Sequence, residues 1–189
     1  MADKIPSIAT SALSNNNERT VLSSILAPGS TTPPHYHTLF AETFTLVSGS
    51  LTLYTSPDGK EESLQAHELQ VGESLMVPIG QVHTFKVGDV EANTTVTFEP
   101  GSLGFERAML IMRGTQKDGT YQEFGVATAD NMMFLAVLSE LTNTNQVGAV
   151  KASMDELYRT KGDEIAAKKK ELLEKYATEE QLKRGTENY

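Results

Sequence analysis

The sequence predicts an all-β barrel of the jelly-roll type that is followed by a helical extension. Short stretches in which apolar and polar residues alternate recur from residue 20 to residue 99, and glycine or proline separates them. No helical pattern interrupts these stretches, which is typical of an all-β barrel. After Pro100 and Gly101, apolar residues recur every three or four positions, as they do in helices. We therefore divide the chain into an N-terminal arm (1–19), a barrel (20–99) and a mainly helical extension (100–189) that packs on the barrel or on a partner.

The expected strands follow one another through the barrel region. The arm before them is polar, with at most a short strand near residues 5–8. The segment from Ser56 to Gly59 has the sequence Ser-Pro-Asp-Gly, which predicts a hairpin because proline presets the turn and glycine tolerates a positive φ. The expected strands are 20–26, 35–37, 42–47, 50–55, 61–65, 74–77, 83–87 and 93–98.

Two helices are expected in the first half of the extension. An apolar stripe over residues 105–112 predicts a helix that stops at Gly114. The run 132–141 is apolar nearly all round, which predicts a buried helix with Asp130 or Asn131 as its N-cap. A strand is the alternative interpretation of this second run.

The rest of the extension has good helix signals from Ser153 onward. Ser153 with Glu156, and Thr178 with Gln181, have the spacing of a capping box. These helices could form a flap over the barrel mouth, a packing brace or a dimer contact, and the sequence does not rank the three.

Three of the four histidines and one acid have the spacing of a metal site. His35 and His37 are two residues apart, so in a strand both imidazoles point to the same face. Glu42 follows after a short turn, and His83 begins another alternating run. Three neutral nitrogens and one carboxylate oxygen suit a divalent transition metal, and six-coordinate geometry would leave two open positions. His67 lies in a polar stretch and is expected at the surface.

At this point the residues resemble the cupin family. The first cupin motif is matched by Gly29, His35, His37, Glu42 and Gly49. The second motif is matched by Gly72, Pro78, Gly80 and His83. Val87 stands where the family motif has asparagine, a position that the family does not use as a metal ligand. The resemblance implies a double-stranded β-helix over roughly residues 20–98, with one metal ion per chain in its mouth, and it makes a homodimer a fair expectation.

The expected pocket around the metal is apolar. Its candidate substrate-binding residues are Phe40 near the entrance, with Phe44, Leu46, Met76, Phe85 and Val87. Such a lining favours a small apolar or aromatic ligand that is anchored to the metal by one oxygen.

Three functions compete on this basis. The first is a metal-dependent oxygenase, as in quercetinase-like cupins, with Fe, Ni, Mn or Cu as the metal and Glu42 as both ligand and proton relay. The second is a non-redox isomerase, cyclase or lyase, in which the metal, Zn included, polarises a carbonyl. The third is a small-molecule binding module without turnover. We favour the oxygenase because three histidines, one glutamate and an apolar lining suit oxygen chemistry, although a shared fold does not select among the three.

Composition narrows the partners. The 189-residue chain has a net charge of −9, which argues against binding to nucleic acid or to an anionic membrane surface. It contains no cysteine, so disulfides and thiolate metal sites are excluded. The first twenty residues lack the apolar core of a signal peptide, and a cytoplasmic location is the expectation.

Overall fold

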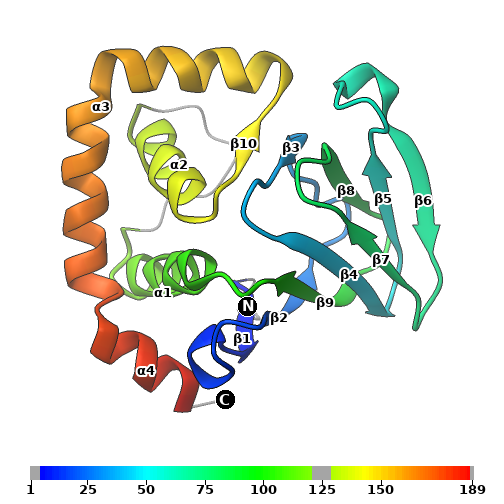
Figure 1. The fold of residues 1–189 in the computed structure, drawn as a ribbon, viewed down its shortest axis with the longest axis horizontal. Coiled ribbons are helices and arrows are strands. Elements are labelled where there is room, and N and C mark those ends of the chain that lie inside the picture. Colours follow the sequence, from blue (N-terminus) through cyan, green and yellow to red (C-terminus); the bar gives the residue numbers. More distant parts are fainter. Residues whose placement is uncertain (1–4, 121–128, 188–189) are drawn as a thin grey trace.

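Two five-stranded antiparallel sheets face each other, and helices lie along one side of them (Figure 1). The structure is a computed structural model that describes residues 5–120 and 129–187. Its strands are β1 (Ser7–Thr10), β2 (Thr20–Leu26), β3 (His35–Tyr36), β4 (Ala41–Ser48), β5 (Leu51–Thr55), β6 (Gln65–Leu69), β7 (Ser74–Val77), β8 (His83–Val87), β9 (Ala92–Glu99) and β10 (Asn145–Gln146). Its α-helices are α1 (Leu103–Lys117), α2 (Ala129–Leu141), α3 (Gly148–Tyr176) and α4 (Glu179–Glu187). Two short 3-10 helices, Ala12–Ser14 and Glu61–Ser63, lie between strands.

The first sheet has the strand order β1-β2-β9-β4-β7 and the second has the order β10-β3-β8-β5-β6. Side chains alternate between core and surface along β4 and β9, so that Glu42, Phe44 and Leu46 all face the interior. The turn after β4 requires glycine at position 49. Gly49 has φ +91°, and a Cβ there would lie 2.0 Å from the Glu91 carbonyl oxygen.

The expectation of an all-β fold holds for the barrel but not for the chain. Four α-helices follow β9, and only the two-residue strand β10 interrupts them in the part of the extension that the structure describes. The run 132–141 is therefore a helix and not a strand. Figure 1 shows α1 and α2 between the barrel and α3, which bends at Lys161, where the backbone has non-helical φ and ψ angles.

Several helix boundaries differ from the expected ones. Gly114 does not end helix α1, which continues to Lys117. The glycine instead lets the Tyr176 ring approach the helix closely, since a Cβ at position 114 would lie 2.1 Å from that ring. Helix α2 begins at Ala129, so neither Asp130 nor Asn131 is its N-cap.

The two expected capping boxes had different outcomes. Helix α3 begins at Gly148, so the box at Ser153 is wrong, since that residue lies inside the helix. The box at Thr178 and Gln181 is confirmed. The Thr178 backbone N–H donates to Gln181 Oε1 at 2.9 Å, and the Gln181 N–H donates to Thr178 Oγ1 at 3.2 Å.

A buried carboxylate ties the N-terminal segment to the first helix. Glu106 of α1 is fully buried and accepts hydrogen bonds from Ser11 Oγ at 2.5 Å, from the Ala12 N–H at 2.8 Å and from Thr20 Oγ1 at 2.6 Å. Each donor would be unsatisfied without the carboxylate. Glu106 thus joins β2, the chain before it and α1.

None of the described helices is both long enough and apolar enough to cross a membrane.

Replacement of Glu106 by glutamine should destabilise the fold. The amide nitrogen would meet donors where the carboxylate now accepts, and we expect the free energy of unfolding in urea to fall by about 2–4 kcal/mol. The matched change at the exposed Glu91 should cost less than about 0.5 kcal/mol. Equal stabilities for Glu106→Gln and Glu91→Gln would show that these hydrogen bonds contribute nothing.

Candidate metal centre

Three histidines and one glutamate converge between the two sheets. His35 lies on β3, His37 directly follows that strand, Glu42 lies on β4 and His83 lies on β8. His35 and His83 are paired across β3 and β8, while Glu42 reaches in from the opposite sheet. One ligand atom from each of the four lies within 4.8 Å of the others. The structure therefore brings together all four residues whose spacing suggested a metal site.

Each histidine is held in one orientation by a backbone carbonyl. The Nδ1 atoms of His35, His37 and His83 lie 2.8, 3.0 and 3.0 Å from the carbonyl oxygens of Pro33, Asn143 and Gln81, respectively. A carbonyl oxygen can only accept, so Nδ1 carries the hydrogen in the neutral ring. The lone pair then lies on Nε2, which is the arrangement that a metal-binding histidine needs.

The four side chains offer the donor atoms and the spacing that a divalent metal ion needs. Glu42 Oε2 lies 2.9 Å from His83 Nε2 and 3.3 Å from His37 Nε2. His37 Nε2 is buried, and no group in the described residues makes a hydrogen bond to it. A nitrogen lone pair that faces a carboxylate oxygen is repelled by it unless a proton or a metal ion lies between the two atoms. Metal bonds of about 2.0–2.2 Å would require only a small contraction of the cluster.

The electrostatics of the site favour a negative Glu42 with a proton on His83 when no metal is bound. Burial lowers the pKa of His35 to about 3, and the charges of His83 and His37 act in the same direction. Burial alone would raise the pKa of Glu42, but the adjacent imidazoles of His37 and His83 outweigh it and hold that pKa well below its usual range. Burial likewise opposes the charge on His83, yet the hydrogen bond and charge of Glu42 raise its pKa overall.

Aromatic rings surround the cluster. The Phe40 ring lies 4.7 Å from the His37 ring, and Phe105 of α1 lies 5.8 Å from both. Phe44 lies 6.1 Å from His83 on another side. These rings give the site apolar walls, and a low local dielectric strengthens each charge interaction there.

Most of the expected pocket residues lie inside the barrel, but Met76 does not. Phe40, Phe44, Leu46 and Val87 are buried, and Phe85 is partly buried against the same core. Met76 is 54 % exposed. Its position in the pocket was wrong because β7 pairs Val77 with Glu42, which turns Val77 inward and Met76 outward.

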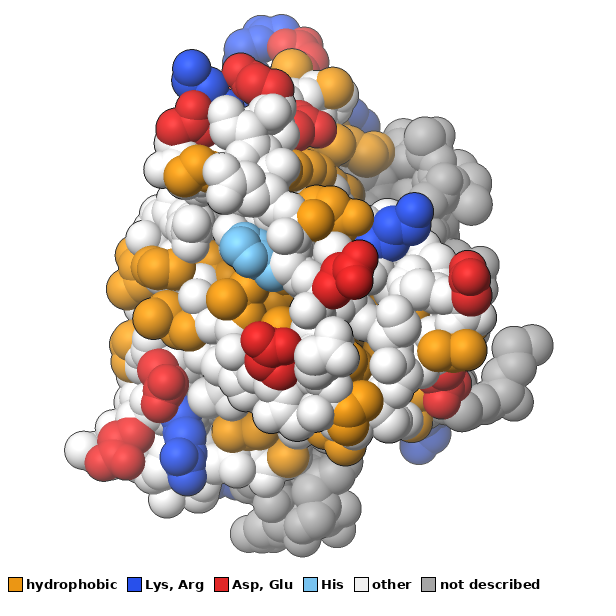
Figure 2. Space-filling view, turned by 90° about the vertical axis from the view of Figure 1, so that its right-hand side faces the viewer, with side chains coloured by type: hydrophobic (Ala, Val, Ile, Leu, Met, Phe, Trp, Pro, Cys, Tyr) orange, Lys and Arg blue, Asp and Glu red, His pale blue; other side chains and the backbone are white. Residues whose placement is uncertain are grey.

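The outer surface of the barrel carries several exposed apolar side chains. Figure 2 looks onto the barrel and shows hydrophobic side chains gathered along one side of it. The large exposed hydrophobic residues before, on and after β4 and β7 are Leu39, Val47, Val71, Met76 and Ile79. The expected homodimer stays a prediction.

Sequence reasoning missed the contribution of the extension to the site. Asn143 follows α2 and has φ +51°, and its carbonyl oxygen orients His37. Its Oδ1 accepts hydrogen bonds from the Thr38 N–H at 2.6 Å, from the Leu39 N–H at 3.1 Å and from Thr38 Oγ1 at 3.0 Å. The polar Thr-Asn-Thr-Asn sequence could have suggested a residue with positive φ at the end of a helix. It could not have suggested that this residue contacts a segment more than one hundred residues away.

Comparison with known proteins agrees with this geometry. Residues 23–98 match the family model described as the cupin domain. This chain contains a cupin domain. The resemblance seen in the two motifs is thus confirmed, and the matched residues end before α1.

Several known proteins are similar to part of this chain. The chain is 31 % identical over 91 residues to germin-like protein subfamily 3 member 2 of Arabidopsis thaliana, a match that covers 48 % of this chain and 39 % of that protein. A Klebsiella pneumoniae protein with a double-stranded β-helix domain is 21 % identical, with a TM-score of 0.42 over 53 % of this chain and 79 % of that one. A recombinant oxalate oxidase in complex with glycolate is 22 % identical, with a TM-score of 0.43 over 52 % of this chain and 53 % of that one.

The raised pKa of His83 predicts how metal affinity depends on pH. The metal-free chain holds a proton on His83 that the metal-bound chain cannot hold, so a lower pH favours the metal-free form. As the pH is lowered, metal affinity should already begin to fall above pH 6.5, because the pKa of His83 is raised. The fall should reach up to about tenfold per pH unit. Titration calorimetry with Zn²⁺ in buffers of different ionisation enthalpy would count the released proton. A constant affinity between about pH 6 and pH 8 would contradict the His83–Glu42 pairing.

Removal of the Asn143 side chain should weaken the metal site without touching a ligand. In Asn143→Gly the backbone can keep its positive φ, but the carbonyl that orients His37 loses its anchor to Thr38 and Leu39. We expect metal affinity to fall about 10- to 100-fold.

The matched variant for this test is Asn143→Asp. Aspartate tolerates the same backbone conformation and keeps the accepting oxygen, so its affinity should stay within about threefold of the parent. Equal affinities for the glycine variant and the parent would show that His37 needs no support from the extension.

Proposed function

We propose that this chain is a metal-dependent oxygenase acting on a small apolar or aromatic molecule, with one divalent transition-metal ion held by His35, His37, Glu42 and His83. The observation that carries the proposal is the convergence of three Nε2 lone pairs on one ionised carboxylate inside a ring of aromatic side chains. A redox-active ion such as Fe, Mn, Ni or Cu would supply the oxygen activation when bound.

The four ligand residues leave room for substrate at the ion. Three imidazoles and one carboxylate do not fill a six-coordinate shell, and open positions distinguish a reactive site from a structural one. Glu42 has a second task in this proposal. As the one carboxylate among the four ligand residues, it would accept a proton from a substrate hydroxyl as that group binds.

The surroundings favour a flat and weakly polar substrate. Phe40, Phe44 and Phe85 lie near the cluster on the barrel side, and Phe105 covers it from α1. A highly charged substrate would lose its hydration there without gaining a matching partner. One oxygen of an aromatic or diketone substrate would suffice to anchor it at the centre, while the rings hold its body.

Elemental analysis and oxygen uptake test the proposal together. Protein purified without a histidine tag should contain close to one Fe, Mn, Ni or Cu per chain, and it should consume oxygen with a phenolic or diketone substrate. His83→Ala should lose the metal, with affinity reduced more than about 100-fold, and circular dichroism of this variant checks that the barrel is still folded. His67→Ala is the matched control and should keep both metal and activity, since His67 lies outside the cluster and bonds Thr55.

Other outcomes would redirect the assignment. Zinc in the site, or a redox metal without oxygen uptake, would favour the non-redox isomerase, cyclase or lyase. Failure to retain any metal would leave the binding module.

A further inference from the structure

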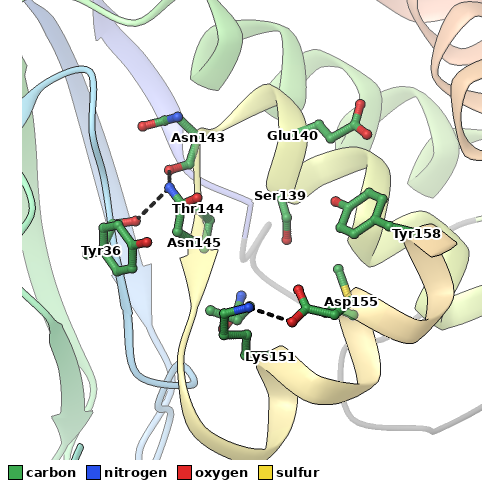
Figure 3. A pocket seen from close by; sticks show the side chains of 11 residues that line it. Tyr36, Ser139, Glu140, Asn143, Thr144, Asn145, Lys151, Asp155 and Tyr158 are labelled. Atoms are coloured by element: carbon green, nitrogen blue, oxygen red, sulfur yellow. Dashed lines mark hydrogen bonds and ion pairs between the residues drawn. The ribbon is translucent and has the colours of Figure 1, made fainter. Parts of the chain in front are cut away.

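The two sheets have four edge strands, which are β1 and β7 in the first sheet and β10 and β6 in the second. An edge strand exposes backbone N–H and C=O groups to pairing with another chain, so folded proteins cover, shorten or charge their edges. Helix α4 packs beside β1 (Figure 1). Strand β10 has only two residues, and the first turns of α3 lie beside it (Figure 3). Strand β6 carries the exposed acid Glu68.

Strand β7 differs from these three edges because it is both uncharged and apolar. Met76 on this strand is 54 % exposed, and Val71 before it and Ile79 after it are also large exposed apolar residues. No charged residue occurs from position 74 to position 81. An edge of this kind is typical of a surface that a partner strand covers.

The hydrogen bonds between β4 and β7 show which backbone groups of β7 point toward β4. The Leu46 N–H donates to the Glu73 carbonyl at 3.1 Å, and the Gly72 N–H donates to the Leu46 carbonyl at 2.8 Å. Bonded pairs recur at every second residue of an antiparallel ladder, so the next bonded pair is Leu75 with Phe44, which lies opposite it.

The exposed groups of this edge are arranged symmetrically about Leu75. Ser74 and Met76, on either side of it, direct their backbone N–H and C=O groups away from β4, and no group in residues 5–120 or 129–187 bonds to them. Val71 and Ile79 also lie at equal intervals of four residues from Leu75. A two-fold axis at Leu75 therefore places Met76 opposite the partner's Ser74 and brings Val71 toward the partner's Ile79.

We propose that two copies of this chain associate by antiparallel pairing of their β7 strands, centred on Leu75. Ser74 of each copy exchanges backbone hydrogen bonds with the partner's Met76, so that the first sheet continues from one copy into the other. The pairing also brings together the apolar residues Val71, Met76 and Ile79. An edge that matches itself about a two-fold axis favours a second copy over an unrelated strand. The contact requires neither the metal nor the proposed oxygenase activity.

Charge opposes this association, because each copy has a net charge of −9. Glu73 is the one charged residue in the sequence from position 69 to position 81, and it lies two residues from Leu75. At a rise of about 3.3 Å per residue, the two Glu73 positions would be about 13 Å apart along the paired strands. This separation exceeds the Debye length of about 8 Å at physiological salt. Added salt should therefore strengthen the dimer.

Sedimentation velocity of the full-length protein tests the contact. The parent should form a dimer with a dissociation constant of about 100 μM or lower, and it should associate more tightly in about 0.5 M than in about 0.05 M NaCl. Met76→Glu places a charge against the partner strand and should raise the dissociation constant at least about tenfold. The matched control is Val90→Glu. Val90 is 55 % exposed in the turn between β8 and β9, so this variant should stay within about threefold of the parent.

Cysteine crosslinking tests the register of the pairing. The sequence contains no cysteine, so a single introduced cysteine can react only with its copy. The axis at Leu75 makes Leu75 and the partner's Leu75 a non-bonded pair with Cα atoms about 4.5 Å apart, within the range of about 4.4–6.8 Å for disulfides. Leu75→Cys should form a covalent dimer under mild oxidation, whereas Val90→Cys should not.

Four results would overturn the proposal. A parent that stays monomeric at about 100 μM would leave the β7 edge to a strand of another protein. A dimer that Met76→Glu leaves unchanged would use another surface, and a dimer that salt weakens would depend on opposite charges. Equal crosslinking of the two cysteine variants would contradict the axis at Leu75. Circular dichroism checks each variant, and should Leu75→Cys fail to fold, the change at the exposed Met76 decides.

Discussion

A buried carboxylate that faces imidazole nitrogens between the two sheets is the constraint on which the rest of the structure depends. Glu42 is buried, ionised and within 3.3 Å of two Nε2 atoms, so the barrel interior requires a positive charge at that point. Without metal a proton on His83 meets this need. With metal, the backbone carbonyls behind the three rings hold every Nε2 lone pair in position, so that little reorganisation is required.

The helical extension is part of this arrangement and not a separate appendage. Strand β10 extends the sheet that carries His35 and His83, and the carbonyl of Asn143 orients His37. Helix α1 adds Phe105, which stacks on Phe98 at 4.2 Å beside the site. The next residue of α1, Glu106, anchors the N-terminal segment. Changes in the extension can therefore reach the centre through packing alone.

The convergence of the four candidate ligands was expected in part because local spacing determines how neighbouring side chains point. The two-residue interval between His35 and His37, and the alternation from Glu42 to Leu46, place those side chains on one face in any strand. The capping box at Thr178 was predictable for the same reason, since each of its hydrogen bonds spans three residues. Such features depend on nearby residues only.

Features set by tertiary contacts could not be predicted in this way. The segment Leu75, Met76, Val77 is uniformly apolar, so only its pairing with β4 determines that Met76 faces outward. Gly114 lies inside α1, where it makes room for the Tyr176 ring, a contact with a residue distant in sequence. The role of Asn143 likewise depends on how α2 and β10 return to the barrel.

The most direct test of the metal centre is X-ray absorption spectroscopy at the edge of the bound metal. The structure predicts three imidazole nitrogens and at least one carboxylate oxygen at about 2.0–2.2 Å, with one imidazole lost in His35→Ala. A shell of oxygen ligands alone, or an unchanged imidazole count in His35→Ala, would contradict the proposed centre.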